Sequence, residues 1–330
     1  MIADNSPPRQ NMRGFDAEFV DLPHYIRVIT ERIWEGRRIN DIHRYYSDPC
    51  IVETPIGVST ALSDVVAGTH ATLKMFPDRR LLAEDIIVSG DDDHGYLSSH
   101  RIISPMTHAG DGSFGPASGK RVHARTIADC VCKNNRIVHE WLVRDHAAIA
   151  YAIGSTPQAL AALWLTEPGG WRKPAADAAP QGYVSHVSAA PLATRYAAMI
   201  ERFAKSEQVE SDVSAIYDPA VHQIAPGETH YYGQAELLAF WRALFSAFAV
   251  IEFRVEHLAE NVSSERGTRV AMRWRAVARH AALGQLGQRF GQETGRTIEI
   301  MGINHAEFAG RKVLREWVLI DEVALWMQVL

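Results

Sequence analysis

The sequence predicts an α+β protein built from two copies of one domain, and three observations lead to this prediction. First, the line His139–Asp145 returns as Arg315–Asp321, with the pattern Glu-Trp-x-x-x-Asp kept at the constant offset that separates Asp145 from Asp321. Second, each half places three helical patterns before its strand patterns, which is typical of an α+β order rather than an alternating α/β one. Third, a length of 330 residues suits two domains of ordinary size.

Apolar residues at helical spacing open each half. The second predicted helix of the first half ends at Ser47-Asp48-Pro49, because the residue before a proline resists helical angles, and Asp218-Pro219 ends its counterpart. The predicted helices are 24–35, 38–46, 61–75, 196–203, 213–217 and 234–248.

Apolar and alternating stretches follow the helices and predict strands. Lys133-Asn134-Asn135 in the first half and Ala309-Gly310 in the second lie between two such stretches and indicate hairpin turns. A strongly curved sheet wrapped around a helix would leave a pocket between them, where small-molecule sites usually lie. The predicted strands are 86–88, 96–103, 120–132, 136–144, 251–260, 268–280, 296–308 and 312–320.

A stretch rich in Pro, Gly, Ala and Gln separates the halves. It has no sustained periodicity, so we interpret 166–190 as a linker. Residues 1–22 are expected to form a loosely held N-terminal arm. The first predicted domain then spans 23–165, and the second, more divergent one spans 191–330.

Composition argues against several classes of function. The net charge of −5 gives no reason to expect nucleic acid, and no apolar run approaches the ~20 residues that cross a membrane. No secretion signal opens the chain, so a cytoplasmic protein is expected. The three cysteines make no disulfide framework and are interpreted as buried filler. The acidic run Asp91–Asp93 near His94 and His100 is interpreted as a turn, and no metal is expected.

A series of short motifs follows in the first half. They are Phe76-Pro77-Asp78, Thr107–Gly110, Ser118–Val122 and Asn135–Asp145. In this order they resemble the SnoaL-like polyketide cyclase family of the nuclear transport factor 2-like superfamily, over about residues 24–152. The resemblance of 192–330 is fainter and rests on Glu293–Arg296 and the second Glu-Trp-x-x-x-Asp line.

The resemblance implies a cone-shaped α+β barrel in each half, with N-terminal helices packed on a curved, mixed and mostly antiparallel sheet. Family members often dimerise through the outside of the sheet, which implies an internal pseudo-dimer or a homodimer for this tandem chain. The named members close polyketide rings by aldol chemistry without metal or organic cofactor. The implied partner is therefore a hydrophobic small molecule, and no cofactor is expected.

Asp145 is the first candidate for acid/base catalysis. Alternate residues of a strand share a face, so Trp141, Val143 and Asp145 are expected to point into the core. A desolvated carboxyl has a raised pKa, as a general acid or base working near neutrality requires. The alternative is that Asp145 caps the helix that follows, and Asp321 in the second half fits both interpretations.

The resemblance implies two further points about the site. The family's acid/base aspartate often follows the tryptophan of this strand directly, and Leu142 and Val318 occupy that place here. The histidine of the family's Thr-His pair matches His108, which implies a hydrogen bond to a substrate carbonyl or a proton shared with a carboxylate. A buried structural histidine is the alternative, and His280 is the equivalent residue of the second half.

One face of the strand that begins near Val122 carries His123, Arg125 and Asp129, and the other carries small, mostly apolar residues. If the polar face is inside, Arg125 and Asp129 form a charged pocket, and if it is outside, it is a solvated face. The second half does not repeat the Arg-Asp pair, so we favour the first half as the chemical one. The predicted substrate-binding residues are Arg125, Asp129, His123, Trp141 and Tyr46, with Trp317 as the equivalent of Trp141.

These observations predict a cofactor-free enzyme that abstracts and returns a proton on a hydrophobic, carbonyl-bearing small molecule. Asp145 would be the acid/base, and His108 with Arg125 would stabilise the enolate. A tandem binding or carrier protein with a pocket but no turnover is the second hypothesis. A hydrolase that activates a pocket water is the third.

Overall fold

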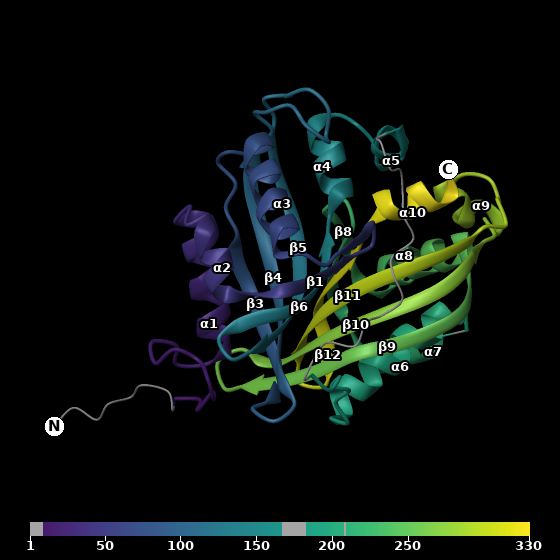
Figure 1. The fold of residues 1–330 in the computed structure, drawn as a ribbon. Helices are drawn as coiled ribbons and strands as arrows, with labels where there is room; N and C mark the ends of the chain where they lie inside the picture. Colours follow the sequence, from purple (N-terminus) through teal and green to yellow (C-terminus); the bar gives the residue numbers. More distant parts are fainter. Residues whose placement is uncertain (1–8, 167–182, 208) are drawn as a thin grey trace.

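The computed structural model describes residues 9–166, 183–207 and 209–330, so most of the predicted linker and the start of the predicted arm lie outside the described residues. In the first half, helices cover one side of a six-stranded sheet (Figure 1). Its helices are α1 (Leu22–Thr30), η1 (Glu31–Glu35), η2 (Ile39–Asp41), α2 (Ile42–Tyr45), α3 (Leu62–Met75), α4 (His146–Ile153) and α5 (Pro157–Thr166). Its strands are β1 (Tyr46–Thr54), β2 (Gly57–Ser59), β3 (Leu82–Asp91), β4 (Gly95–Thr107), β5 (Arg121–Lys133) and β6 (Arg136–Arg144).

The second half repeats this arrangement with a six-stranded sheet of its own. Its helices are α6 (Pro191–Ala204), α7 (Glu210–Ile216), α8 (Gly233–Ala247), α9 (Gly284–Gly287), η3 (Gln288–Phe290) and α10 (Glu322–Val329). Its strands are β7 (Tyr217–Ala225), β8 (Thr229–Tyr232), β9 (Phe248–Ser263), β10 (Gly267–His280), β11 (Thr297–Ala309) and β12 (Lys312–Ile320).

Both sheets have the same topology. The strand order is β2-β1-β6-β5-β4-β3 in the first half and β8-β7-β12-β11-β10-β9 in the second. Strands β3 to β6 pair antiparallel, whereas β1 runs parallel to β6 and β7 runs parallel to β12. The prediction of two α+β units with mixed, mostly antiparallel sheets is therefore confirmed.

The sequence pattern misses the first strand of each half. Helix α2 ends at Tyr45, and Tyr46, which the helical pattern includes in the helix, begins β1. Proline is rare in strands because it cannot donate to the ladder. Pro49 is tolerated in β1 because the pairing with β6 shifts register between Tyr46 and Ile51. The turn-like composition of this segment thus conceals a strand that pairs with a partner far along the chain.

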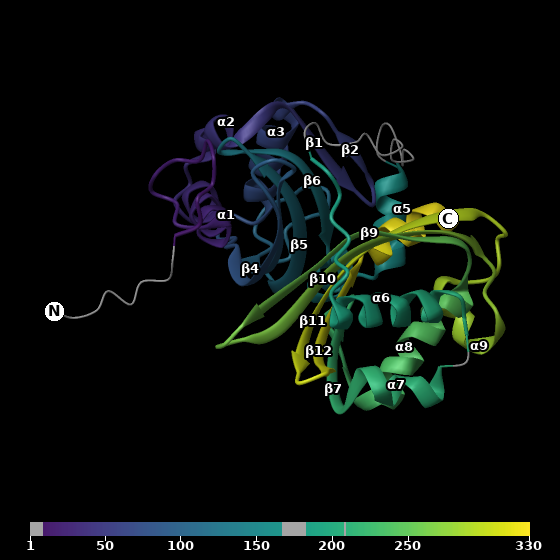
Figure 2. The ribbon, with the colours of Figure 1, turned by 90° about the horizontal axis from the view of Figure 1, so that it is seen from below.

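The outer faces of the two sheets pack against each other. Figure 2 shows the two sheets between the helices, with α1 to α3 on one side and α6 to α8 on the other. Burial of apolar surface stabilises this contact. The buried cluster comprises Leu97, Ile127, Val131, Trp141 and Val143 of the first half, Met301, Ile303 and Leu319 of the second, and Tyr183 from the segment between them.

The two faces of β6 are exchanged relative to the prediction. Trp141 and Val143 face the second half and not the core of their own half, so the predicted inward face is wrong. Glu140, Leu142 and Arg144 face the helices instead. The alternation itself is as predicted, but it cannot distinguish the faces, because the contact between the halves is apolar like a core.

A buried ion pair crosses this contact. Arg273 Nη1 donates to Asp129 Oδ2 at 2.7 Å, and the two side chains are 2% and 0% exposed. The guanidinium of Arg273 also lies 3.5 Å from the ring centre of Trp141, and that of Arg101 lies 3.4 Å from the ring centre of Trp317. Each half thus places an arginine on the tryptophan of the other half's repeated line.

The structure also shows the state of the cysteines, the possible metal-binding groups and the apolar helices. The three cysteines are unpaired and buried, as predicted. Across the described ranges, no group of three or more His, Cys, Asp or Glu side chains could hold a metal ion. Within those ranges no single helix is long and apolar enough to cross a membrane. Helices α4 and α5 have the required length and composition only when taken together, and they are bent by 101° relative to each other.

Replacing Arg273 by alanine is expected to lower the free energy of unfolding by about 3–5 kcal/mol, because Asp129 loses its partner in a buried site. Urea unfolding followed by tryptophan fluorescence measures this difference. Arg279→Ala, at an exposed position of the same strand, is the matched control and should change stability by less than about 0.5 kcal/mol. If the free energy of unfolding falls by less than about 0.5 kcal/mol in both variants, the ion pair does not stabilise the contact between the halves.

Candidate active site

A cavity of about 220 Å³, here called the first-half cavity, lies between the inner face of the first sheet and helices α1, η1 and α3. Ile29, Ile33 and Val65 form its wall on the helix side, and Ala128 and Leu142 form part of its wall on the sheet side. An apolar chamber with a few ionisable groups is the usual form of a small-molecule site. Its ionisable side chains are Tyr46, Asp64, Arg79, His100, Cys130, Glu140 and Arg144.

Strand register orders the polar groups along this cavity. Glu140, Leu142 and Arg144 share the inner face of β6, since alternate residues of a strand point the same way. Their partners on β5 are, in the same order, Cys130, Ala128 and Thr126. Glu140 and Arg144 therefore have Cα atoms roughly 13 Å apart, at opposite ends of the row.

Glu140 is the buried carboxyl group of this cavity, whereas Asp64 on its wall is exposed. It is 8% exposed, and within the described ranges no hydrogen-bond donor contacts its carboxyl group. Burial raises the pKa of Glu140 to about 7, and the positive charge of Arg144 offsets part of that rise. A carboxyl group with this pKa populates both protonation states near neutral pH, as general acid/base catalysis requires.

His100 and Tyr46 bring hydrogen-bond donors to the same cavity. His100 on β4 is 2% exposed, and its Nε2 atom has no partner among the described residues. Burial lowers the pKa of His100 to about 3, so the ring is neutral at physiological pH and carries one N–H. Burial, and then the charge of Glu140, raise the pKa of Tyr46 well above its usual value, so its hydroxyl keeps the proton. Both groups can donate to a carbonyl oxygen.

Asp145 and Asp321 lie outside the first-half cavity and cap helices. Asp145 accepts from the backbone N–H of Ala148 in α4 at 2.9 Å and from that of Gly227 in the second half at 2.9 Å. Asp321 caps α10 in the same way. Burial raises the pKa of Asp145 to about 7, yet backbone donors occupy its oxygens. The helix-cap alternative therefore describes both residues, and the acid/base role predicted for Asp145 is not supported by its position.

His108 is held in a structural environment. It is fully buried, its Nδ1 lies 3.2 Å from Ser118 Oγ, and its ring centre lies 5.3 Å from that of Phe76. His280 repeats this arrangement, with Nδ1 3.0 Å from Thr294 Oγ1. Neither histidine lines the first-half cavity. The alternative of a buried structural histidine is thus the one that the geometry favours.

The substrate-binding residues predicted on β5 connect the two halves instead. Arg125 forms ion pairs with Glu84 at 2.8 Å and with Glu228 of the second half. His123 is exposed, whereas Tyr46 does lie on the wall of the first-half cavity. Asp129, Trp141 and Trp317 lie in the contact between the two halves. On the polar face of β5, Arg125 and Asp129 therefore lie in the interface between the halves, whereas His123 is exposed to solvent.

In the second half, the equivalent carboxyl group is fully hydrogen-bonded. Glu316 is the counterpart of Glu140 in the repeated line. It accepts from the hydroxyl groups of Tyr196 and Tyr217 at 2.7 and 2.9 Å, and from Gln223 Nε2 at 2.6 Å. The same acid is thus fixed by three donors in one half and unpaired at a cavity wall in the other.

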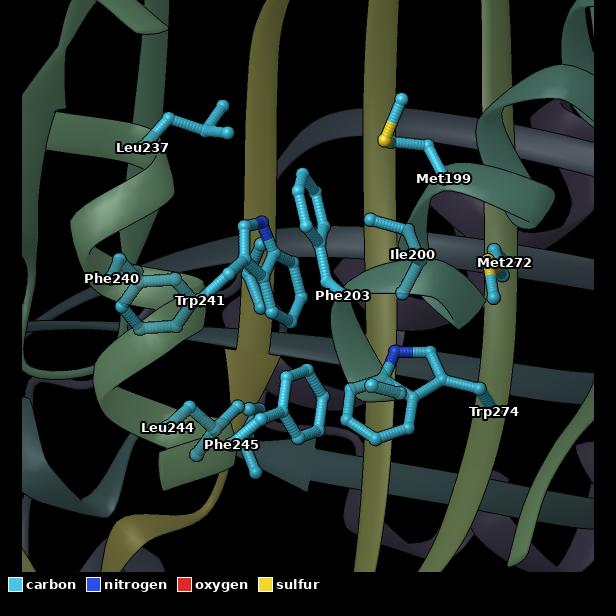
Figure 3. Packing of buried hydrophobic residues seen from close by; sticks show 14 of the residues in the cluster. Met199, Ile200, Phe203, Leu237, Phe240, Trp241, Leu244, Phe245, Met272 and Trp274 are labelled. Atoms are coloured by element: carbon cyan, nitrogen blue, oxygen red, sulfur yellow. The ribbon is translucent and has the colours of Figure 1, made fainter. Parts of the chain in front are cut away.

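Strand register shows what fills the corresponding space of the second half. Ile102 pairs with Thr126, and Trp274 pairs with Gly302, which is the counterpart of Thr126 in the repeat. The Trp274 ring lies over Gly302, where a Cβ atom would approach it to 2.3 Å, and its Nε1 donates to Asn304 Oδ1 at 3.0 Å. The neighbouring core aromatics are Phe203, Trp241 and Phe245 (Figure 3). Side chains therefore pack where the first half keeps a cavity.

Each half is thus an α+β unit in which helices cover a curved sheet, and the first half has a cavity between the two layers. Residues 25–153 match the SnoaL-like polyketide cyclase family, and residues 196–316 match the SnoaL-like domain family. The chain belongs to the SnoaL-like family and carries two of its domains in tandem. A search of the curated proteins found no match.

Solved structures that are similar to part of the chain have low sequence identity. IdmH from Streptomyces antibioticus is 18% identical, over 40% of this chain and 97% of that chain, with a TM-score of 0.35. A SnoaL-like polyketide cyclase from Agrobacterium tumefaciens is 19% identical, over 40% and 98%, with a TM-score of 0.33. TsrD from Streptomyces laurentii is 16% identical, over 43% and 98%, with a TM-score of 0.36. These values are too low to indicate an activity.

The sequence holds a signal for Glu140 that the predicted facing conceals. Leu142 occupies the place at which the resembling family often has its acid, so that place belongs to the cavity face. Alternation from Leu142 then puts Glu140 and Arg144 on the same face. The prediction chose Asp145 instead, because Asp145 shares a face of the strand with Trp141 and that face was expected to be the inner one.

The stability of the protein is expected to fall, relative to that of Glu140→Gln, as the pH rises from about 4.5 to about 7. The pKa of Glu140 is higher in the folded than in the unfolded chain, so the folded state holds the proton more tightly. The resulting stabilisation is complete below the unfolded pKa and lost near the folded one, and it amounts to about 3 kcal/mol. Urea unfolding of both proteins from about pH 5 to about pH 8 measures this change. A pH-independent difference between them would contradict it.

Proposed function

We propose that the first half binds a hydrophobic, carbonyl-bearing small molecule and moves a proton on it, with Glu140 as the acid/base. The observation that carries this proposal is the contrast between two equivalent carboxyl groups. Glu316 is held by three donors in a filled core, whereas Glu140 faces a cavity with no donor among the described residues. Burying a carboxyl group without a partner costs free energy, so stability does not account for Glu140.

The proposed chemistry is abstraction of a proton next to a carbonyl group and its return, which covers isomerisation and aldol ring closure. Glu140 takes the proton from carbon. The N–H of His100 and the hydroxyl of Tyr46 donate hydrogen bonds to the carbonyl oxygen, on which negative charge develops. The apolar wall limits the access of water to the enolate. These steps use only side chains of this protein, in line with the prediction that no cofactor is needed.

A binding or carrier protein without turnover is the second candidate. Leu142 favours it, because the resembling family often has its acid at that place. Both candidates need the first-half cavity and differ only in whether Glu140 exchanges a proton with the ligand. A measurement of proton exchange therefore separates them.

The domain organisation belongs to the same proposal. We propose the boundaries 23–165 and 191–330 for the two domains, and we interpret the contact between their sheets as the internal counterpart of the family's implied dimer. The packing of Trp141 and Trp317 under arginines of the opposite half supports this interpretation. A homodimer and a cytoplasmic location remain predictions from the sequence.

Glu140→Gln is expected to slow exchange of ketone α-protons with D2O by roughly 10²–10⁴-fold, because it removes the base without changing the shape of the cavity. Hydrophobic ketones that raise the Tm of the wild-type protein are selected first, and their exchange is then followed by proton NMR. His123→Ala, at an exposed position of β5, is the control and should exchange like the wild type. Equal rates for wild type and Glu140→Gln would refute the role of Glu140. Ketones that bind without accelerated exchange would favour the carrier protein.

Ligand binding is expected to be lost when the first-half cavity is filled by a tryptophan, in the way that Trp274 fills the corresponding space of the second half. The double variant Ile102→Trp with Thr126→Gly copies the pair Trp274 and Gly302 at matching register positions. It should fold, because the glycine makes room for the indole ring, and the selected ketones should no longer raise its Tm. A folded double variant that still binds them would place the ligand outside this cavity.

A further inference from the structure

Two arginines on the wall of the first-half cavity lack an acidic partner. Arg79, between α3 and β3, is 5% exposed, and its Nε atom has no hydrogen-bond partner among the described residues. Arg144, the last residue of β6, forms no ion pair with any residue of the described ranges. The buried Arg101 and Arg273, by contrast, both pair with carboxylates. The guanidinium of Arg79 lies 5.1 Å from the ring centre of Trp34, and Arg144 is partly buried. Because a cation that is largely removed from water without an ion pair is costly, the two arginines are suited to an anionic ligand.

Arg79 and Arg144 both lie where two cavities adjoin. Arg79, Thr126 and Arg144 line both the first-half cavity and a neighbouring space of about 50 Å³, here called the small cavity. Burial and then the charge of Arg144 lower the pKa of Arg79 to about 9, so each cation lies in the field of the other. Ser104 also lines the small cavity, and its buried Oγ has no hydrogen-bond partner in the described part of the chain. The described residues around the small cavity include no carboxylate.

We propose that this junction binds a carboxylate group, so that the ligand of the first half is a hydrophobic keto acid rather than a neutral ketone. The planar guanidinium group matches a carboxylate with two parallel hydrogen bonds. The inference rests on the ligand cavity of the proposed function, but not on turnover.

The position of Arg144 on β6 gives the ligand a direction. Its Cα atom stands roughly 13 Å from that of Glu140, and Ala128 and Leu142 lie between the two ends of the row. The carboxylate therefore binds at the junction, an apolar chain crosses the middle, and the carbonyl group lies near Glu140. In the second half, Ile320 is the counterpart of Arg144 and is 2% exposed, so the half in which Trp274 packs over Gly302 also has no cation at this position.

The test compares aryl keto acids of increasing chain length with their methyl esters, by isothermal titration calorimetry on the full chain. The wild-type protein should bind at least one acid roughly 10- to 100-fold more tightly than its ester. Arg144→Ile, which introduces the residue of the second half, should remove this difference by weakening the acid alone. Arg121→Ile, the same change at an exposed position of β5, should preserve it.

Three results would overturn the inference. They are equal binding of acid and ester by the wild type, an equal loss of both in Arg144→Ile, and tighter binding of a phosphate monoester with the same apolar body. Arg144→Ile should keep or raise the Tm, since it removes a partly buried charge that forms no ion pair within the described ranges. Arg79→Met allows the same comparison should that variant fail to fold. Glu140→Gln should keep the preference for the acid while losing proton exchange, so failure of the carboxylate site and failure of the proposed reaction are separate results.

Discussion

The contact between the outer faces of the two sheets determines where this protein can hold a ligand. Side chains alternate along a strand, so once one face of β6 packs against the other half, any site must lie on the opposite face. The apolar cluster around Trp141 and the buried ion pair of Arg273 with Asp129 stabilise this orientation of β6. Glu140 and Arg144 face the helices as a consequence, and the cavity forms around them.

The two halves use the same buried carboxyl group in different ways. In the second half a chain of hydrogen bonds runs from Trp274 through Asn304 and Tyr196 to Glu316, and every donor in it finds an acceptor. Satisfied networks of this kind fix a single packing of a core. Glu140 stands outside any such network in the described structure, at the wall of an open chamber. A tandem protein can in this way assign rigidity to one domain and ligand chemistry to the other.

Much of the fold could be predicted because long strands, hairpin turns and amphipathic helices carry their signals locally. Strand β1 could not, because Pro49 breaks the pattern and the strand joins the sheet through a distant partner. The site required knowledge of which face of β6 is interior, and Trp141 on one face and Leu142 on the other are both apolar enough for a core. Packing against the second half determines which of the two faces is interior. Contacts of this kind, such as the ion pair of Asp129 with Arg273, join residues far apart in the sequence and cannot be predicted from local spacing.

The fit of Trp274 over Gly302 has a consequence for how the two halves can change. Any side chain added at Gly302 meets the indole ring, and a smaller residue in place of Trp274 leaves a void that lowers stability. A return to an open chamber needs both replacements, and each one alone gives a weaker fold. The open and the filled form of this core thus differ by two coupled replacements, so neither half can take on the packing of the other through one stable substitution.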